Sequence, residues 1–495
     1  MSSVLLEAIR THPMSFRLTL AFLAFGILPI GTNHAAETPP NIIIILADDM
    51  GYGDCTAYNP ESKIPTPHID QLASEGLRFT DAHAPASTCT PSRYGLLTGI
   101  NPQRTGVRNT LLGKGLPVID ETETTIAEVL KKHGYLTEMI GKWHLGFDMD
   151  TGKERPAFDF SKPLTSGPID RGFDRFFGVH SSAGAQPLCY FEGRGVVSEP
   201  TEKFSYQDEH KTINALASPG FSLEGTSPLF CKKAIETIKR QAASEQDKPF
   251  FLYYSSIIPH KPWVPTEAFR GKSQLGPYGD FVMQLDDVVG QINRALKETG
   301  LDQNTIVIFT SDNGPGPPSV KAMAADGHAS AGGLRGSKAD AWEGGHRVPL
   351  IVKWPVETPP DQTTSATVNL TDIFATLTEM LETDLPEGAV NSHSFLSVLH
   401  DPQEPHSRPP MVQGRHSVRL GNWKIVAPSR NTDAAKLEQS HFQLFNLDED
   451  LTEQNNLSKK HPEKFEQLHR VFTDFVKQRR LKAPDVIGAS RPKAK

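Results

Sequence analysis

The chain has few cysteines, no strong excess of charge of either sign and no internal repeat. Its 495 residues include only four cysteines. Disulfide bonds are therefore too sparse to carry the fold, and a conventional hydrophobic core must do so. The formal net charge of −7, with 22% charged residues, gives no case for a nucleic-acid partner or an anionic membrane. The length suits one large α/β domain with a smaller second one.

Apolar stretches long enough to span a membrane comfortably are also missing. The run at residues 18–30 is about a dozen residues, whereas a transmembrane helix needs about 20. With Arg10 and Arg17 before it, this run is typical of a secretory signal peptide, predicted over residues 1–36 with Met14 as an alternative start. We therefore expect an exported protein, periplasmic or extracellular, with no membrane span once mature. An uncleaved N-terminal anchor is the alternative.

Four continuous apolar runs are typical of strands that are buried on both faces of a parallel sheet. They lie at residues 41–46, 250–254, 305–310 and 349–354. Helical patterns lie between these runs, at residues 125–133, 229–242 and 281–299. Strands that alternate with helices predict an α/β fold, with a mostly parallel sheet flanked by helices.

This alternation stops near residues 382–394, which sets the predicted end of the large α/β domain at residues 37–390. Shorter strand-like segments and one helical pattern follow, at residues 418–420, 423–426, 442–446 and 462–479. We therefore expect a C-terminal α+β subdomain over residues 391–482, with a short antiparallel sheet and one helix. The last residues, 483–495, are basic and predict a flexible tail.

The segment Cys89-Thr90-Pro91-Ser92-Arg93 places a thiol near a proline and an arginine. Because proline favours the start of a helix, we expect a helix that begins just after Cys89 and holds Arg93 about one turn inside. Unpaired backbone N–H groups and a fixed positive charge would then surround the thiol, which suits a nucleophile that handles anions. The alternative is a buried structural cysteine before an ordinary helix.

Residues 89–99 resemble the signature of the sulfatase family, C-x-P-S-R-x-x-x-L-T-G. Residues 134–146 resemble a second motif of that family, G-Y-x-T-x-x-x-G-K-W-H-L-G. Further matches keep the family's order, at residues 41–49, 259–260, 311–314, 334–338 and 445–448. The resemblance implies a formylglycine-dependent, calcium-binding, arylsulfatase-like enzyme with the alkaline-phosphatase-like fold of that superfamily.

Oxygen-bearing side chains directly follow two of the predicted strands, namely Asp48 and Asp49 after the first and Asp312 and Asn313 after the run at residues 305–310. Because ligands bind beyond the carboxyl ends of parallel strands, neighbouring strands would bring three carboxylates together, which requires a cation. An all-oxygen set favours Ca²⁺ or Mg²⁺ over zinc. The resemblance implies one Ca²⁺ per chain at these four positions. The alternative is that each pair only caps a helix or a turn.

The resemblance also implies the chemistry at this site. A formylglycine-generating enzyme would oxidise Cys89 to formylglycine, whose hydrate would attack sulfur and pass through a formylglycine–sulfate intermediate. Expulsion of sulfate would need the second hydroxyl of the hydrate, which a serine at this position lacks. The matched positions assign Arg93 and Lys142 to the diol and the sulfate, His144 to the proton of the second hydroxyl, and His260 and Lys338 to the leaving group.

Candidate substrate contacts rest on weaker patterns. A family serine that contacts sulfate matches Ser182, although His180 departs from the usual pattern and Ser181 is an alternative register. Three further candidates for a sugar pocket are His328, Arg415 and His416. The alternative for these three is an ordinary surface position.

The resulting hypothesis is a sulfuric ester hydrolase that converts an O-sulfate ester to an alcohol and inorganic sulfate. A sulfated carbohydrate is the favoured substrate, because export and polar, glycine-rich loops suit a glycan, while aryl sulfates stay open. The alternatives are a phosphonate monoester or phosphodiester hydrolase with the same nucleophile, and a non-catalytic binding protein whose Cys89 is never oxidised. Conversion of Cys89 leaves Cys55, Cys189 and Cys231, enough for one disulfide whose pairing stays open.

Overall fold

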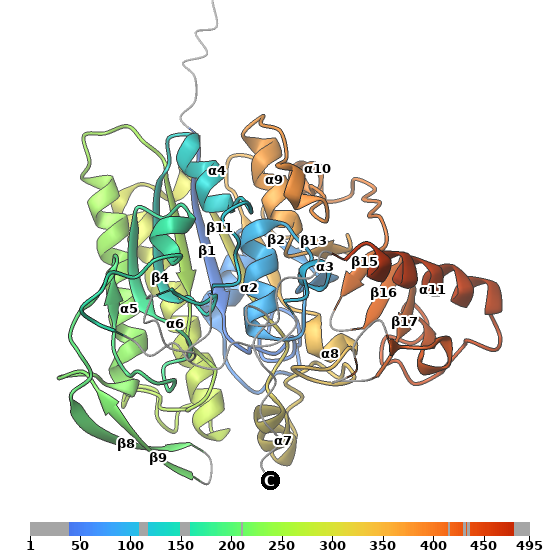
Figure 1. Cartoon of the computed structure of the whole chain (residues 1–495), viewed down its shortest axis with the longest axis horizontal. Coiled ribbons are helices and arrows are strands. Elements are labelled where there is room, and N and C mark those ends of the chain that lie inside the picture. The colour runs from blue at the N-terminus through green and yellow to red at the C-terminus, as the bar shows by residue number, and fades with distance from the viewer. Residues whose placement is uncertain are drawn as a thin grey trace, which may run out of the picture. The chain divides into compact units, whose positions relative to one another are not determined.

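The computed structural model describes residues 39–107, 117–148, 159–208, 211–413, 416–428, 432 and 436–479. The predicted signal peptide and the predicted C-terminal tail lie outside these residues. Within them, the main feature is a ten-stranded sheet that carries helices on both faces (Figure 1). The order of its strands is β13-β2-β12-β11-β1-β10-β4-β5-β6-β7.

Five parallel strands form the middle of this sheet. In spatial order they are β11 (Thr305–Ser311), β1 (Asn41–Ala47), β10 (Phe250–Ser255), β4 (Leu136–Lys142) and β5 (Arg175–Val179). The β-branched isoleucines of β1 favour an extended, pleated backbone, and every residue of this strand is buried. Since the five strands run in the same direction, their carboxyl ends meet at one edge of the sheet.

The flanks of the sheet include both antiparallel and parallel pairs, and one predicted strand differs in direction. The apolar run at residues 349–354 forms β12 (Leu350–Lys353), which pairs antiparallel with β11. Because β12 is buried on both faces, its sequence is as apolar as that of a parallel strand, so composition does not reveal its direction. The other flanking strands are β2 (Leu77–Phe79), β13 (Gln362–Thr364), β6 (Phe191–Glu192) and β7 (Gly195–Val196).

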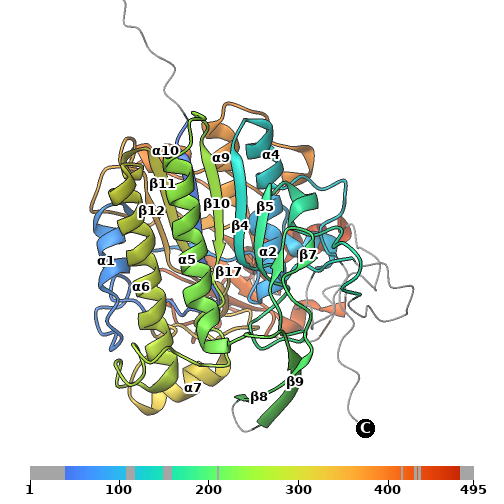
Figure 2. The ribbon, with the colours of Figure 1, turned by 90° about the vertical axis from the view of Figure 1, so that its left-hand side faces the viewer.

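Successive side chains of a strand point to opposite faces, and this alternation gives the sheet two cores. The helices concerned are α1 (Pro67–Ser74), α2 (Cys89–Thr98), α4 (Ile126–Lys132), α5 (Leu223–Ala242), α6 (Gly276–Thr299) and α9 (Asp372–Met380). Ile42 and Ile44 of β1 share one core with α2, α4 and α9. Ile43 and Ile45 share the other with α1, α5 and α6. Figure 2 shows α1, α5 and α6 on one side of the sheet and α2 and α4 on the other.

Local signals explain where the predicted helices begin. Helix α4 starts at a capping box, in which the Thr125 side chain accepts from the Glu128 N–H and the Glu128 side chain accepts from the Thr125 N–H. Helix α5 starts at Leu223, six residues earlier than predicted, because the side chain of Ser222 caps it by accepting from the Gly225 N–H. Thus α5 extends through a proline that interrupts the simple helical pattern.

A separate four-stranded antiparallel sheet lies near the C-terminus (Figure 1). Its strands are β15 (Met411–Gln413), β16 (Ser417–Leu420), β17 (Trp423–Val426) and β18 (Gln443–Asn446), and α11 (Pro462–Lys477) accompanies them. Val418 and Ile425 pack with Leu468 and Phe472 of α11 in a core of their own. The predicted fold class is confirmed, whereas the predicted boundary at residue 390 stays a prediction.

Shorter elements lie in the connections. They are β3 (Ala82–His83) paired with β14 (Val368–Asn369), β8 (Glu202–Asp208) paired with β9 (Lys211–Ala217), α3 (Pro102–Thr105), α7 (Pro317–Ala325), α8 (Glu343–His346) and α10 (Leu396–His400). All four cysteines lie among the described residues, and each is buried and unpaired, so the disulfide considered above does not form. In the part of the chain that the structure describes, no helix has the length and apolar character needed to cross a membrane.

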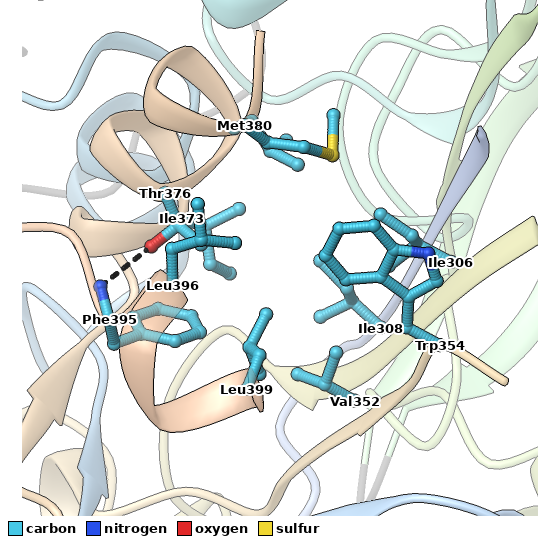
Figure 3. A pocket seen from close by; sticks show the side chains of 11 residues that line it. Ile306, Ile308, Val352, Trp354, Ile373, Thr376, Met380, Phe395, Leu396 and Leu399 are labelled. Carbon is cyan, nitrogen blue, oxygen red and sulfur yellow. Dashed lines mark hydrogen bonds between the residues drawn. The ribbon is translucent and has the colours of Figure 1, made fainter. Parts of the chain in front are cut away.

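A small apolar gap lies between the sheet and the helices α9 and α10 (Figure 3). It is lined by Ile306, Ile308, Val352, Trp354, Ile373, Thr376, Leu377, Met380, Phe395, Leu396 and Leu399. The hydroxyl of Thr376 is engaged, because its oxygen accepts from the Phe395 N–H at 3.1 Å. The gap therefore offers no polar partner to water, and side chains around it already lack some packing contacts.

We expect Leu399→Ala to lower the free energy of unfolding by about 2–5 kcal/mol, because it removes buried methyl groups beside a gap that the neighbours do not fill. Urea unfolding, followed by circular dichroism, measures this cost. The control is Leu385→Ala, since 38% of Leu385 is exposed, and it should cost less than about 1 kcal/mol. Equal costs for the two variants would contradict the core position of Leu399.

Candidate active site

The acidic residues that follow β1 and β11 lie together at the carboxyl edge of the sheet. The two strands pair in parallel along their whole length, so Asp48 and Asp49 lie beside Asp312 and Asn313. The Asp49 N–H donates to Asp312 Oδ1 at 3.1 Å, and Asn313 Nδ2 donates to Asp49 Oδ1 at 2.8 Å. Asp49 has a φ of 67°, an uncommon conformation outside glycine that persists only where the surroundings hold it.

Cys89 lies against the same carboxylates. Helix α2 starts at Cys89 itself, so Pro91 is its third residue rather than its first. The Cys89 Sγ lies 3.7 Å from Asp48 Oδ1 and 3.7 Å from Asp49 Oδ1. It also lies 3.0 Å from the Nζ of Lys338. The predicted nucleophile and the predicted metal ligands therefore converge, although they lie far apart in sequence.

Arg93 is one turn inside α2, as its position in the sequence predicts. Its Nε and Nη2 both donate to Asp312 Oδ2, at 3.0 and 2.7 Å, and its Nη2 lies 3.4 Å from Asp48 Oδ1. The Nη1 donates to the Lys142 carbonyl at 3.2 Å and to the hydroxyl of Ser255. The guanidinium is fully buried, so its geometry is set by these partners and it provides a fixed positive charge.

Lys142 and His144 come from the carboxyl end of β4. The Lys142 Nζ lies 2.9 Å from both carboxylate oxygens of Asp48. His144 has a φ of 57°; its N–H donates to the His180 carbonyl and its carbonyl accepts from the Thr90 hydroxyl, each at 2.9 Å. These two bonds hold a strained turn next to the start of α2.

His260 and Lys338 form the exposed side of the cluster. The His260 Nε2 lies 3.7 Å from Asp49 Oδ2, and the Lys338 Nζ lies 2.5 Å from Asp49 Oδ1. Their side chains are 19% and 15% exposed, whereas those of Arg93 and Lys142 are fully buried. Solvent therefore reaches the cluster at this corner, and a substrate would enter there.

Burial and charge set the ionisation of the cluster. Burial, reinforced by the Asp312 carboxylate, raises the pKa of the Cys89 thiol to about 12, so an unmodified thiol stays protonated at neutral pH. Burial would also raise the pKa of Asp49, but Lys338 and His260 outweigh it and hold that pKa below its ordinary value. Burial lowers the pKa of His260 despite the nearby carboxylates, which keeps its imidazole neutral near pH 7.

The cluster has the donor set of a divalent cation site. Ligand atoms of Asp48, Asp49, Asp312 and Cys89 all lie within 4.8 Å of one another. The Oδ1 of Asn313 is buried and accepts no hydrogen bond, which is costly unless another group occupies its lone pairs. Carboxylate and amide oxygens suit hard cations such as Ca²⁺ and Mg²⁺, so these residues fit a metal ion.

His328, a candidate for the sugar pocket, has a different environment. It is 2% exposed, its Nε2 lies 2.9 Å from Asp54 Oδ1, and its Nδ1 accepts from the Lys63 N–H at 3.3 Å. Asp54 also accepts from the Gly51 N–H at 2.8 Å and from the Tyr278 hydroxyl. His328 therefore supports the turn that carries the metal-ligand candidates Asp48 and Asp49. No pattern in the sequence distinguished Asp54 or Tyr278 as part of that support.

Of the other three candidate substrate contacts, the two that the structure describes gain no support from their positions. Ser182 follows β5, at the same edge as Lys142, and its carbonyl accepts from the Ala185 N–H at 2.9 Å in a local turn. His416 is buried beside β16 in the C-terminal sheet. Arg415 lies outside the described residues. Substrate contact by these residues, and by His328, stays a prediction.

This chain is similar to known proteins over most of its length. The model of the Sulfatase family matches residues 40–383. This chain belongs to the sulfatase family. It is 36% identical to the N-acetylgalactosamine-6-O-sulfatase of Bacteroides thetaiotaomicron, over 90% of this chain and 95% of that protein. It is 35% identical to human arylsulfatase A, over 80% and 76% of the two chains.

Solved structures give the same family. A structure from Bacteroides thetaiotaomicron, described with the metabolism of multiple glycosaminoglycans, has a TM-score of 0.78 and 33% identity over 89% of this chain and 100% of that one. The phosphonate monoester hydrolase of Agrobacterium radiobacter, at 17% identity and a TM-score of 0.59, shares the fold alone. The predicted family is confirmed, and this sulfatase is a sulfuric ester hydrolase.

Asn313→Ala should weaken the affinity of the sulfatase for a divalent cation at least about tenfold, because it removes a buried ligand oxygen. Isothermal titration of the metal-stripped protein with Ca²⁺ measures the affinity. The control is Asn41→Ala at the opposite end of β1, where the amide donates to the Asn304 carbonyl at 3.2 Å. This control should lose stability but keep the metal affinity. An unchanged affinity in Asn313→Ala would remove Asn313 from the ligand set.

Proposed function

We propose that this sulfatase hydrolyses the sulfate ester of a carbohydrate, uses one Ca²⁺ per chain, and requires Cys89 to be converted to formylglycine. The observation that carries the proposal is the position of the Cys89 sulfur. It lies 3.7 Å from two carboxylates of the candidate metal site and 3.0 Å from Lys338, at the exposed corner. A nucleophile, a cation site and fixed positive charges therefore share one small space.

The fixed cations suit a sulfate ester. Hydrolysis develops negative charge on the sulfate oxygens and on the leaving oxygen, and oriented positive groups stabilise such charge most strongly where water is excluded. Arg93 and Lys142 are fully buried, and Lys338 adds a third cation at the exposed corner. Held at Asp48, Asp49, Asp312 and Asn313, a Ca²⁺ ion would act as a Lewis acid toward the hydroxyl of residue 89 and the sulfate.

The proposed reaction needs two hydroxyl groups on residue 89. A hydrated aldehyde at position 89 would supply one hydroxyl to attack sulfur and a second to release sulfate, which neither cysteine nor serine offers. We assign the proton of the second hydroxyl to His144, which is tied to α2 through Thr90. His260 and Lys338 line the exposed corner, where the alcohol leaves, and we assign them to the leaving oxygen.

A carbohydrate is supported by the relatives and by the rim of the site. The names of two relatives at 33% identity or more refer to N-acetylgalactosamine sulfate and to glycosaminoglycan metabolism. The β8–β9 ribbon (Figure 2) packs on the loops beside His260, since Tyr206 donates to the Gly184 carbonyl at 2.6 Å and Lys261 lies 3.7 Å from Asp208. A polar rim of this kind suits a hydroxyl-rich substrate.

Maturation and location follow from the same proposal. Conversion of Cys89 requires a formylglycine-generating enzyme in the host, which is the maturation partner that we propose. The N-terminal sequence supports export to the periplasm or the extracellular space. The three remaining cysteines are buried and unpaired, so the exported fold needs no disulfide.

Cys89→Ala should abolish turnover, and Cys89→Ser should stop after at most one sulfate transfer per chain, because neither supplies two hydroxyls. Burst kinetics with 4-nitrophenyl sulfate measures both. Mass spectrometry of the wild-type peptide should show a loss of about 18 Da at Cys89, as expected when an aldehyde replaces the thiol. Sustained turnover by either variant would exclude this nucleophile, and an unmodified peptide from active enzyme would exclude formylglycine.

Sulfated sugars should be better substrates than 4-nitrophenyl sulfate by at least about tenfold in kcat/KM, because binding of the sugar would contribute to the transition state. A panel of sulfated mono- and disaccharides, including N-acetylgalactosamine 6-sulfate, tests this by release of inorganic sulfate. Bis(4-nitrophenyl) phosphate and a phosphonate monoester are the controls and should react more slowly. Faster turnover of either control would favour a phosphodiester or phosphonate hydrolase, and a preference for aryl sulfates would reject the carbohydrate.

A further inference from the structure

A buried cluster of charges joins the C-terminal sheet to the large sheet. The Nζ of Lys424, on β17, lies 2.7 Å from Glu343 Oε1 of α8 and 2.9 Å from Glu453 Oε1. All three side chains are fully buried. The Glu453 carboxylate also accepts from the Glu343 N–H at 2.7 Å. Lys424 therefore contacts two buried carboxylates. Glu343, which belongs to α8, also pairs with Arg347, whose Nη1 lies 3.2 Å from its Oε2.

A second buried ion pair joins the C-terminal sheet to the segment that precedes Cys89. Arg419 of β16 donates to both oxygens of Asp81, at 2.7 and 2.6 Å. Asp81 in turn lies 2.9 Å from the Nε2 of His83, on β3. Residues 81–83 begin the segment that leads directly to Cys89. The C-terminal sheet is thus bonded both to α8 and to the segment before the nucleophile.

These residues form an ion-pair network rather than a second metal site. Ligand atoms of His83, Glu343 and His346 lie within 4.8 Å of one another, which alone would suit a metal. However, the Lys424 Nζ lies 3.2 Å from the Nε2 of His346, and the Arg419 Nη1 lies 3.0 Å from the Nε2 of His83. Fixed cations therefore already contact these atoms, and they would repel a divalent ion.

The backbone of α8 links the network to the active site at two points. Its Gly345 carbonyl accepts from the Gly314 N–H at 3.0 Å, directly after Asn313. Its His346 carbonyl accepts from the Ala84 N–H at 2.7 Å, in the segment that leads to Cys89. The first contact is close, because a Cβ on Gly314 would lie 1.9 Å from the Gly344 carbonyl oxygen. A shift of α8 would therefore move two segments together, namely the metal-ligand loop that holds Asn313 and Gly314 and the segment from Ala84 to Cys89.

We propose that Lys424 is a positioning residue for sulfate ester hydrolysis, because it holds α8 and thereby sets the distance between residue 89 and the metal-ligand loop. This inference rests on the proposed roles of Cys89 and Asn313. It makes the C-terminal sheet part of the catalytic machinery, although the sheet contributes no residue to the cluster around Cys89 described above. Loss of Lys424 would leave Glu453 buried without its lysine partner and Glu343 with only Arg347, whose Nη1 lies 3.2 Å from Glu343 Oε2. This state is unfavourable, and a shift of α8 would relieve it.

Lys424→Met tests this proposal. We expect kcat for 4-nitrophenyl sulfate to fall at least about tenfold, because displacements of about 1 Å at reacting groups cost up to about 100-fold in rate. KM should change less than kcat, because the substitution lies in the C-terminal sheet and removes no side chain from the exposed corner of His260 and Lys338. Hydrogen exchange, measured by mass spectrometry, should become faster in the peptides that contain the amides of Ala84 and Gly314.

The matched control is Lys353→Met, which breaks another ion pair of a buried lysine. The Lys353 Nζ lies 2.6 Å from Glu75 Oε2, and Lys353 pairs with Val307, toward the amino end of β11 and away from the site. This variant should lose stability but keep kcat and the exchange rates of those two peptides. Lys424→Arg should recover part of kcat, because it restores the positive charge.

The outcomes separate this proposal from the proposed function. Equal kcat losses in Lys424→Met and Lys353→Met, or unchanged exchange at Ala84 and Gly314, would overturn the positioning role. A wild type that releases no sulfate would reject the proposed function. Hydrogen exchange at Ala84 and Gly314 would still show whether loss of Lys424 disturbs the two backbone contacts of α8. If Lys424→Met does not fold, Arg419→Lys is the second variant. It keeps the positive charge but loses the pair of hydrogen bonds from the guanidinium to Asp81. It should lower kcat, and an unchanged kcat would contradict the proposal.

Discussion

The convergence of like charges at the end of two neighbouring strands governs the rest of this structure. Parallel pairing of β1 and β11 places Asp48, Asp49 and Asp312 in one buried space, and such a cluster is untenable without compensating positive charge. Arg93 and Lys142 provide part of that charge from two other elements. The fold around the site is largely an arrangement that brings these cations to the carboxylates and keeps water from them.

The same compensation explains why the site is suited to sulfate esters. A sulfate ester would add negative charge to a place where the fixed cations Arg93 and Lys142 already face inward. The carboxylates there would also hold a divalent ion. In the described cluster, the side chains of His260 and Lys338 are the most exposed, at 19% and 15%, so a substrate would enter at this corner. Deep cations fix the geometry of the reaction, whereas the rim, including the β8–β9 ribbon, is free to differ between sulfatases with different substrates.

Residues outside the carboxylate cluster hold its loops in place. Asp54, His328 and Tyr278 hold the turn after β1 from one side. Lys424 and Glu343 hold the loop after β11 from the other. Each support is a buried polar group whose partner lies on a distant segment, and such pairs are costly to break singly. The active site therefore depends on both sheets of the protein.

Features that depend on neighbouring residues along the chain could be predicted before the structure was known. Unbroken apolar runs predicted the buried strands, and strand-end carboxylates predicted the candidate metal site. The motif around Cys89 predicted a helix with Arg93 one turn inside, although α2 begins at Cys89 itself. Tertiary structure alone decided the direction of β12, the burial of His328 against Asp54, and the link from Lys424 to Asn313 through α8. These features depend on which distant segments meet, and residues far apart in sequence carry no local pattern that records their contact.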